Sequence, residues 1–138
     1  MEANFSKELK SLLELSRVEA LRHNNKIIRP EHLLLALMSK DTTEAYRVLK
    51  EVVGLDRMLE VKINLDNELF EAPGVGDELT ASDLANRILK LSVLEARMLK
   101  SEEVDSEHLL LAIFHNNEMK ATSAIKAMQE AGATYEAR

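Results

Sequence analysis

The stretch PEHLLLALM at Pro30–Met38 returns as SEHLLLAIF at Ser106–Phe114. Both copies contain Glu-His-Leu-Leu-Leu-Ala, and they lie 76 positions apart. At the same offset, eleven of the 26 residues in 13–38 are identical to their counterparts in 89–114. Self-similarity at a fixed offset is typical of an internal duplication. We therefore expect two copies of one structural unit, related by a pseudo-two-fold axis.

Each unit opens with a pattern typical of an amphipathic helix. Apolar and small residues recur at helical spacing on one face of 5–20, and again on one face of 81–96. The stripe positions are Phe5, Leu9, Leu12, Leu13, Ser16 and Ala20 in the first copy, and Ala81, Ala85, Ile88, Leu89, Ser92 and Ala96 in the second. Thr80, with Asp83 three residues later, is expected to cap the helix of the second copy.

The repeated motif is expected to begin a second helix in each unit. Pro30 suits a first helical turn, where its missing N–H costs nothing. Asp105 is a favourable N-cap residue for the second copy. The Leu-Leu-Leu-Ala that follows is expected to lie in the core.

Later segments predict further helices. We expect third helices at Thr43–Val53 and Ala121–Ala131, each ended by a glycine. The stretch Arg57–Leu69 predicts a fourth helix in the first unit. Phe70–Glu78 contains one Pro and two Gly and is expected to be the loop that joins the units.

These elements predict an all-α fold of about seven to eight helices, which form one compact domain over residues 1–138. Repeat 1 is expected over about 5–69, the linker over 70–78 and repeat 2 over about 79–136. Matched positions should be equally buried in the two repeats. The matched pairs are Leu13 with Leu89, Leu33 with Leu109, Leu34 with Leu110, and Ala36 with Ala112.

Composition argues against several classes of function. The formal net charge of −6 disfavours a nucleic-acid partner and an anionic membrane surface. The longest apolar runs are six residues, far below the length of a membrane span. The chain has no cysteine, so disulfides and thiolate chemistry are excluded, and a cytoplasmic location is expected.

No catalytic motif emerges from the residues. The phosphate-binding pattern G-x-x-x-x-G-K-[ST] is absent, so we expect no ATP site in this chain. His32 and His108 each follow a Glu but lack a second ligand at helical spacing, so we expect no metal. Ser16 and Ser92 lie within helical stripes without an adjacent base. We therefore expect no catalytic residues and no cofactor here.

The Glu-His pairs allow two interpretations. In the structural one, Glu31 and Glu107 are favoured in a first helical turn by free N–H groups and the helix dipole. His32 and His108 would then bond to the backbone near the helix start. In the functional one, the two carboxylates bind a ligand.

The order EA…(I/V)…EHLLLAL, written twice with a Pro/Gly-containing linker, resembles the N-terminal domain of Clp-family AAA+ unfoldases, and most of all the ClpC type. This resemblance implies a non-catalytic, all-α domain in front of a hexameric ATPase. Such a domain recruits protein substrates and adaptor proteins, while separate AAA+ modules use ATP. Those modules are absent from this chain, so it is expected to be a monomer. It is either a fragment or a stand-alone adaptor or inhibitor without an ATPase.

The resemblance also suggests site residues. In some ClpC proteins the Glu of each motif contributes to a pocket for phosphorylated arginine, and the matching positions here are Glu31 and Glu107. Arg29 and Ser106 lie beside them. Those relatives usually have Thr before the Glu, whereas this chain has Pro30 in one copy and Ser106 in the other.

The surroundings of the two glutamates differ in charge. The first has Arg22, Lys26 and Arg29 nearby in sequence; the second has Glu102, Glu103 and Asp105. We expect phosphoarginine to prefer the Glu31 pocket and unmodified basic peptides to prefer the Glu107 pocket.

Overall fold

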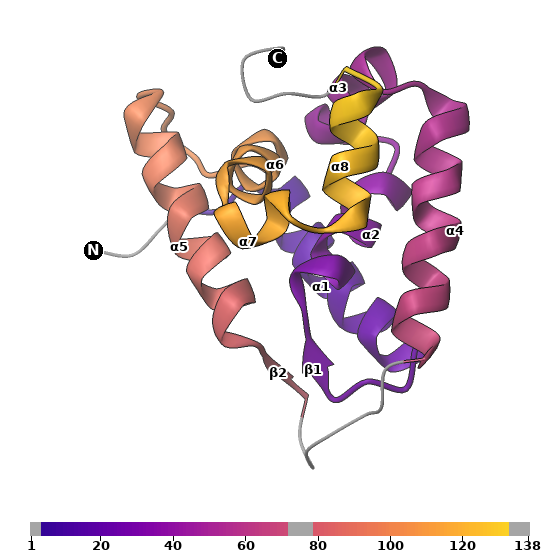
Figure 1. Ribbon diagram of the computed structural model, residues 1–138. Coiled ribbons are helices and arrows are strands. Elements are labelled where there is room, and N and C mark those ends of the chain that lie inside the picture. Colours follow the sequence, from indigo (N-terminus) through magenta and orange to yellow (C-terminus); the bar gives the residue numbers. More distant parts are fainter. Residues whose placement is uncertain (1–3, 72–78, 133–138) are drawn as a thin grey trace.

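The structure, a computed structural model, describes residues 4–71 and 79–132. These residues form eight helices and two short strands, which confirms the expected all-α fold (Figure 1). The elements in chain order are α1 (Lys7–Arg22), β1 (Ile27–Ile28), α2 (Pro30–Ser39), α3 (Glu44–Val52), α4 (Leu55–Glu71), β2 (Thr80–Ala81), α5 (Asp83–Met98), α6 (Ser106–His115), α7 (Asn117–Lys120) and α8 (Ser123–Glu130).

The two repeats exchange short extended segments. Strand β1 pairs in parallel with β2, so that Ile28 lies opposite Ala81. An isolated parallel bridge joins Phe5 to Val104. At the 76-residue offset, Phe5 matches Ala81 and Val104 matches Ile28. The segment before the first helix of each repeat therefore pairs with the connection inside the other repeat, as a pseudo-two-fold axis requires.

This pairing corrects two expectations about the helix starts. Phe5 and Ala81 were expected to be the first positions of helical stripes, yet both are extended. The N-caps are Ser6 and Ser82, each of which accepts a backbone N–H three residues ahead at 3.0 Å. Thr80 is therefore not the cap, because the strand pairing holds it in β2. Cross-strand hydrogen bonds satisfy the backbone up to the serine, and the helix begins only after it.

The starts of α2 and α6 agree with the sequence. Pro30 is the first residue of α2. Asp105 is the N-cap of α6, and its carboxylate accepts the Ser106 N–H at 2.7 Å. Helices α3 and α8 are each followed by a glycine with positive φ, as expected.

Two boundaries differ from the expectation. Thr122 caps α8, so the helix expected at Ala121–Ala131 begins at Ser123 and ends at Glu130, and a separate short helix, α7, precedes it. Helix α4 continues through Glu71, so Phe70 and Glu71 are helical rather than part of the linker. Residues 72–78 of that expected loop lie outside the described residues.

The core is built around α2 and α6, which pack against each other and against α1 and α5. Matched positions are similarly buried in the two repeats, as predicted. The fully or almost fully buried pairs are Leu33 with Leu109, Leu34 with Leu110, and Ala36 with Ala112. Leu13 and Leu89 are half-buried at the edge of this core.

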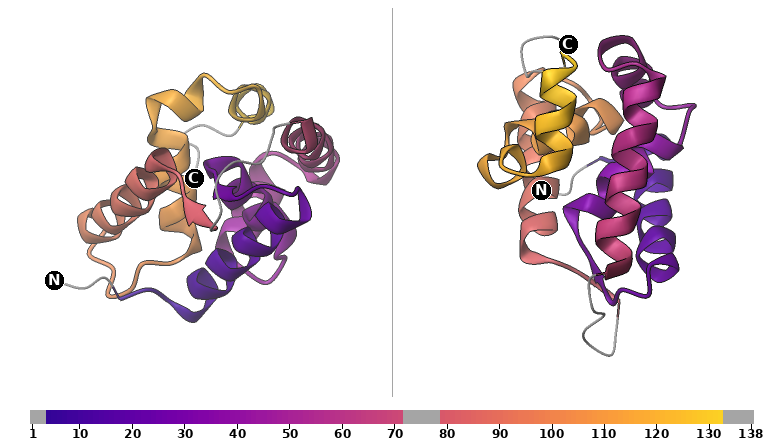
Figure 2. Two further views of the ribbon diagram at one scale, coloured as in Figure 1. Left: turned by 90° about the horizontal axis from the view of Figure 1, so that it is seen from below. Right: turned by 45° about the vertical axis from the view of Figure 1, so that its right-hand side comes forward.

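Helix α4 breaks the pseudo-symmetry, because no helix among the described residues matches it in repeat 2. It packs against α2 and α8 (Figure 2). Within residues 4–71 and 79–132, none of the helices combines the length and the apolar content that crossing a bilayer requires.

Candidate functional site

The histidines of the two Glu-His motifs cap their own helices. His32 Nδ1 accepts the Arg29 N–H, and His108 Nδ1 accepts the Asp105 N–H, both at 2.9 Å. Each histidine is the third helical residue, the position from which a capping-box side chain reaches back to the N-cap amide. Both imidazoles are buried. The structural interpretation of the two histidines is thus confirmed.

His32 is held in its neutral form. Burial, with the nearby charges of His23 and Arg29, lowers the pKa of His32 to about 4. Because Nδ1 accepts a hydrogen bond, the ring proton lies on Nε2. This Nε2 is buried and has no hydrogen-bond partner among the described residues. The ring therefore serves the helix start and leaves no nitrogen lone pair for a metal.

Glu31 and Glu107 occupy the second position of α2 and of α6 and are half-buried. A carboxylate there lies close to the free N–H groups and the positive end of the helix dipole. Glu107 Oε1 is shielded from solvent, yet it accepts no hydrogen bond from the described part of the chain. Because Glu107 as a residue is only half-buried, a cationic ligand group would approach the carboxylate from its solvent-accessible side.

Ser106 and Arg29 have different environments. The Ser106 side chain is 0% exposed, and its hydroxyl accepts the Ala45 N–H of α3 at 3.0 Å. The buried hydroxyl thus satisfies a helix-start amide in the other repeat. Arg29 is the N-cap of α2, two residues before Glu31, and is half-buried.

Arg22, expected near Glu31, is instead held in an ion-pair network. Its Nη2 lies 2.8 Å from Glu19 Oε1 and 2.5 Å from Asp66 Oδ1. The hydrogen bond to Glu19, with the Asp66 contact, raises the pKa of Arg22. Its guanidinium also lies over the Phe70 ring, 5.5 Å from the centroid. These contacts engage the Arg22 guanidinium with α4.

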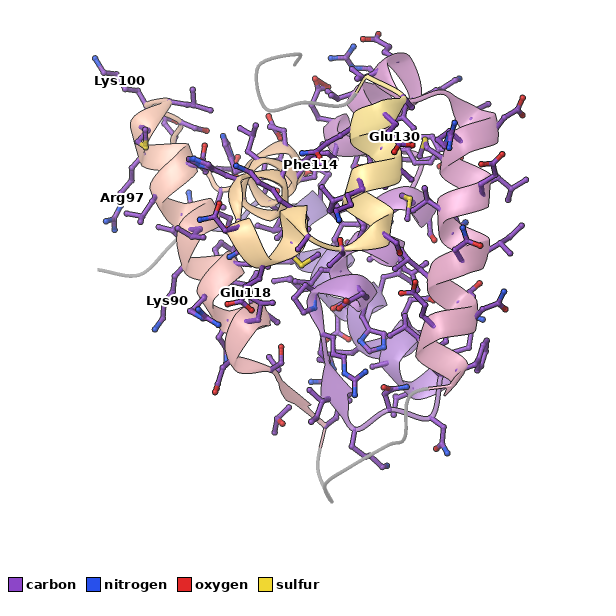
Figure 3. The ribbon with its side chains drawn as sticks, in the orientation of Figure 1. Lys90, Arg97, Lys100, Phe114, Glu118 and Glu130 are labelled. Atoms are coloured by element: carbon purple, nitrogen blue, oxygen red, sulfur yellow. The ribbon has the colours of Figure 1, made fainter. Side chains whose placement is uncertain are left out.

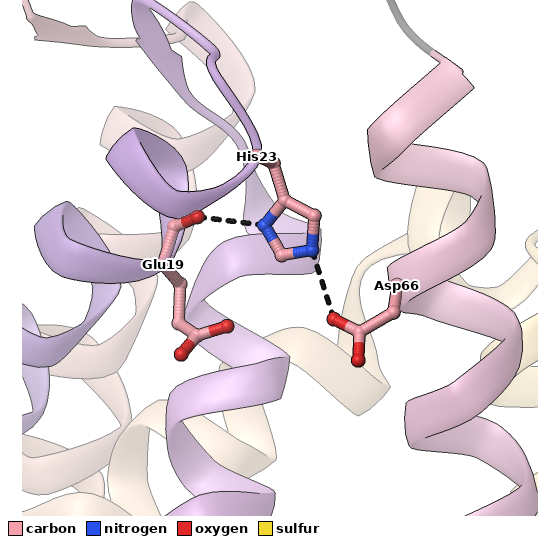
Figure 4. A group of neighbouring side chains, drawn as sticks. All are labelled: Glu19, His23 and Asp66. Carbon is pink, nitrogen blue, oxygen red and sulfur yellow. Dashed lines mark hydrogen bonds and ion pairs between the residues drawn. The ribbon is translucent and has the colours of Figure 1, made fainter.

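His23 is the centre of a cluster that sequence reasoning missed (Figure 4). Its Nδ1 lies 2.6 Å from the Glu19 backbone oxygen, and its Nε2 lies 2.8 Å from Asp66 Oδ1. Glu19, His23 and Asp66 are close enough together to hold a metal ion. Arg22 already provides these carboxylates with a positive charge. No sequence signal links Asp66, on α4, to the end of α1.

Comparison with known proteins gives a family match over most of the chain. The family model described as "Clp repeat (R) N-terminal domain" matches residues 4–128. The chloroplastic chaperone protein ClpC1 of rice is 28% identical over 125 residues. That alignment covers 90% of this chain and 13% of the relative, so the chain spans about one eighth of its length.

Solved structures share the fold. The N-terminal domain of the ClpV1 ATPase from E. coli superposes with a TM-score of 0.80 at 20% identity, covering 97% of this chain and 80% of that one. The Hsp104 N-terminal domain from Candida albicans has a TM-score of 0.74 at 20% identity, covering 97% of this chain and 85% of that one.

Proposed function

The chain belongs to the Clp repeat (R) N-terminal domain family, and from this premise we propose that it docks protein substrates and adaptors for a ClpC-like, ATP-dependent unfoldase. The chain itself performs no catalysis in this proposal. The ATPase modules belong to the parent protein, which we place in the cytoplasm. The finer assignment to the ClpC type rests on the doubled EHLLLA motif and on the similarity to the rice protein.

The observation that carries the proposal is the pair of half-buried carboxylates at matching first-turn positions of α2 and α6. An arginine guanidinium is a planar donor that matches a carboxylate and forms charge-assisted hydrogen bonds with it. Glu31 occupies the matching position in repeat 1, so the duplication provides two candidate contacts for arginine-bearing substrates.

The two contacts should differ in ligand preference. Glu102, Glu103 and Asp105 precede Glu107 and would repel a phosphate, so this site favours unmodified arginine or lysine. Arg29 and Lys26 precede Glu31 and favour a ligand that carries phosphate as well as guanidinium. Pro30 removes one amide donor there, and Arg22 is held by Asp66, so Arg29 becomes the main candidate cation.

The test follows backbone amide shifts by NMR during titration with free phosphoarginine and with a short arginine-containing peptide. We expect Glu31→Gln to weaken phosphoarginine binding and Glu107→Gln to weaken peptide binding. Glu8→Gln is the matched control, because Glu8 is the second residue of α1 and is exposed.

The reverse assignment of the two variants would overturn the ligand preference. If Glu8→Gln weakened binding as much as Glu31→Gln and Glu107→Gln do, the losses would be explained by the change in net charge. If neither ligand binds, the structural interpretation holds for both glutamates, which then only stabilise the starts of α2 and α6.

A further inference from the structure

The outer face of α5 is basic although the protein as a whole is acidic. Lys90, Arg97 and Lys100 are exposed, and Figure 3 shows them projecting from the same outer side of this helix region. No ion pair involves them within the described residues. Glu95 is the only acidic residue in 84–101, and it is 5% exposed. The formal net charge of the whole chain is −6, so this face is a local concentration of positive charge on an acidic protein.

Apolar surface lies beside these cations. Leu94 is 49% exposed and Met98 is 72% exposed. Leu94 lies between Lys90 and Arg97 on the same helix face, at i+4 from one and i−3 from the other. A shallow groove borders this face; it is lined by Phe5, Asn86, Leu89, Lys90 and Val93.

The matched helix α1 lacks this basic character. At the 76-residue offset, Lys90 corresponds to Glu14, Arg97 to Leu21, and Lys100 to Asn24. Since α1 and α5 pack in the same way against their partner helices, the packing does not need cations at these positions. Acidic residues lie at the two ends of the face, where Asp83 begins α5 and Glu102 follows Lys100, and beside it, where Glu118 pairs with Arg87 at 3.3 Å.

We infer that the outer face of α5 docks an acidic, amphipathic protein segment. Carboxylates of the segment would meet Lys90 and Arg97, which are separated by about 10 Å along the helix axis. An apolar side chain between them would pack on Leu94 or enter the groove beside Val93. The inference rests on the proposed docking role but uses a surface distinct from the Glu-His motifs.

A protein segment fits this face better than a nucleic acid does. Three exposed cations neutralise few phosphates, and the negative charge of the remaining surface repels a polyanion. The exposed apolar side chains would gain nothing from a sugar-phosphate backbone, whereas they match the apolar positions of an amphipathic helix. Complementary charge around an apolar centre is the usual arrangement of a specific protein interface.

The probe is a fluorescent 14-residue peptide made of two Leu-Glu-Glu-Leu-Leu-Glu-Glu repeats, with binding followed by anisotropy at low and at high salt. We expect Lys90→Glu/Arg97→Glu to weaken binding about tenfold or more, because two exposed ion pairs become repulsive. The matched control is Lys10→Glu/Arg17→Glu on the exposed face of α1, which changes the net charge equally and should alter affinity less than about twofold.

Further variants and probes test the inference independently. Leu94→Gln should weaken binding, and a peptide with Gln in place of Glu should bind poorly. Equal losses in the two charge-reversal pairs, or tighter binding of a single-stranded oligonucleotide than of the peptide, would overturn the inference. Glu8→Gln should leave binding of this acidic peptide unchanged, and arginine binding at Glu31 and Glu107 is measured in parallel. If arginine binding at those glutamates persists while this peptide fails to bind, only the α5 inference is lost.

Discussion

The Ser6 hydroxyl donates a 2.6 Å hydrogen bond to the Asp105 carboxylate, and so joins the N-cap of α1 to the N-cap of α6 in the other repeat. The same hydroxyl accepts the Leu9 N–H. Ser82 is the matched cap of α5 and accepts an N–H in the same way. The position that matches Asp105 is Arg29, which cannot accept a hydrogen bond through its side chain.

This asymmetry predicts unequal costs for two matched substitutions. Ser82→Ala should lower the free energy of unfolding by about 1 kcal/mol, because only a cap is lost. Ser6→Ala should lower it by about 2–3 kcal/mol, because a charge-assisted hydrogen bond is lost as well. Urea unfolding followed by circular dichroism measures both. Equal effects would mean that the contact with Asp105 adds nothing.

His32 predicts a specific dependence of stability on pH. The pKa of His32 is about 4 in the folded chain, against an ordinary value of 6.5. Between these values the unfolded chain binds a proton that the folded chain does not. The free energy of unfolding should therefore fall as pH drops from 6.5 to 4, by up to about 3 kcal/mol. Above pH 6.5 this contribution is constant.

The control for this prediction is His32→Gln, which keeps an acceptor for the Arg29 N–H but has no ionisable group. Chemical unfolding at a series of pH values should give a shallower slope for the variant than for the natural sequence between pH 4 and 6.5. Superimposable slopes would show that His32 does not control acid stability.

Leu34 tests the core of the first repeat. Its side chain is 0% exposed, so Leu34→Ala should lower the free energy of unfolding by about 2–5 kcal/mol through lost burial and a residual cavity. Leu59→Ala on α4 is the control, because that side chain is 57% exposed and should cost less than about 0.5 kcal/mol. A small effect at Leu34 would contradict its place in the core.

Ser106 separates stability from ligand binding. Ser106→Ala leaves the Ala45 N–H without its acceptor and should lower the free energy of unfolding by about 1–2 kcal/mol. Arginine-peptide affinity should change by less than about twofold, because the hydroxyl is buried. Calorimetric titration beside thermal unfolding distinguishes the two effects. Reduced affinity with unchanged stability would restore Ser106 as a ligand residue.

The isolated chain is predicted to be a monomer that does not bind ATP. The sequence has no phosphate-binding loop, and hexamer-forming modules are expected only in the parent. Light scattering and calorimetry provide the measurements. A hexameric mass or a micromolar affinity for ATP would contradict this prediction. It would also contradict the proposal that this chain docks substrates while separate modules of the parent protein use ATP.

Local sequence patterns were sufficient for most of the fold. The duplicated motif predicted the pseudo-two-fold arrangement, and apolar spacing predicted the helices, because a helix buries residues that are three or four positions apart. Pro30 and Asp105 marked the starts of α2 and α6 through effects confined to one turn. Glu31 and Glu107 were likewise found from a motif of adjacent residues.

Only the tertiary structure decided features that depend on residues far apart in the sequence. Phe5 is extended rather than helical because Val104 is its partner. The Ser106 hydroxyl faces inward because the start of α3 lies against it. Asp66 draws Arg22 toward α4, and the exposed cations of α5 acquire a groove only where Phe5 crosses that helix. Sequence periodicity identifies which face of a helix is buried, but it contains no information on which distant backbone or carboxylate will meet that face.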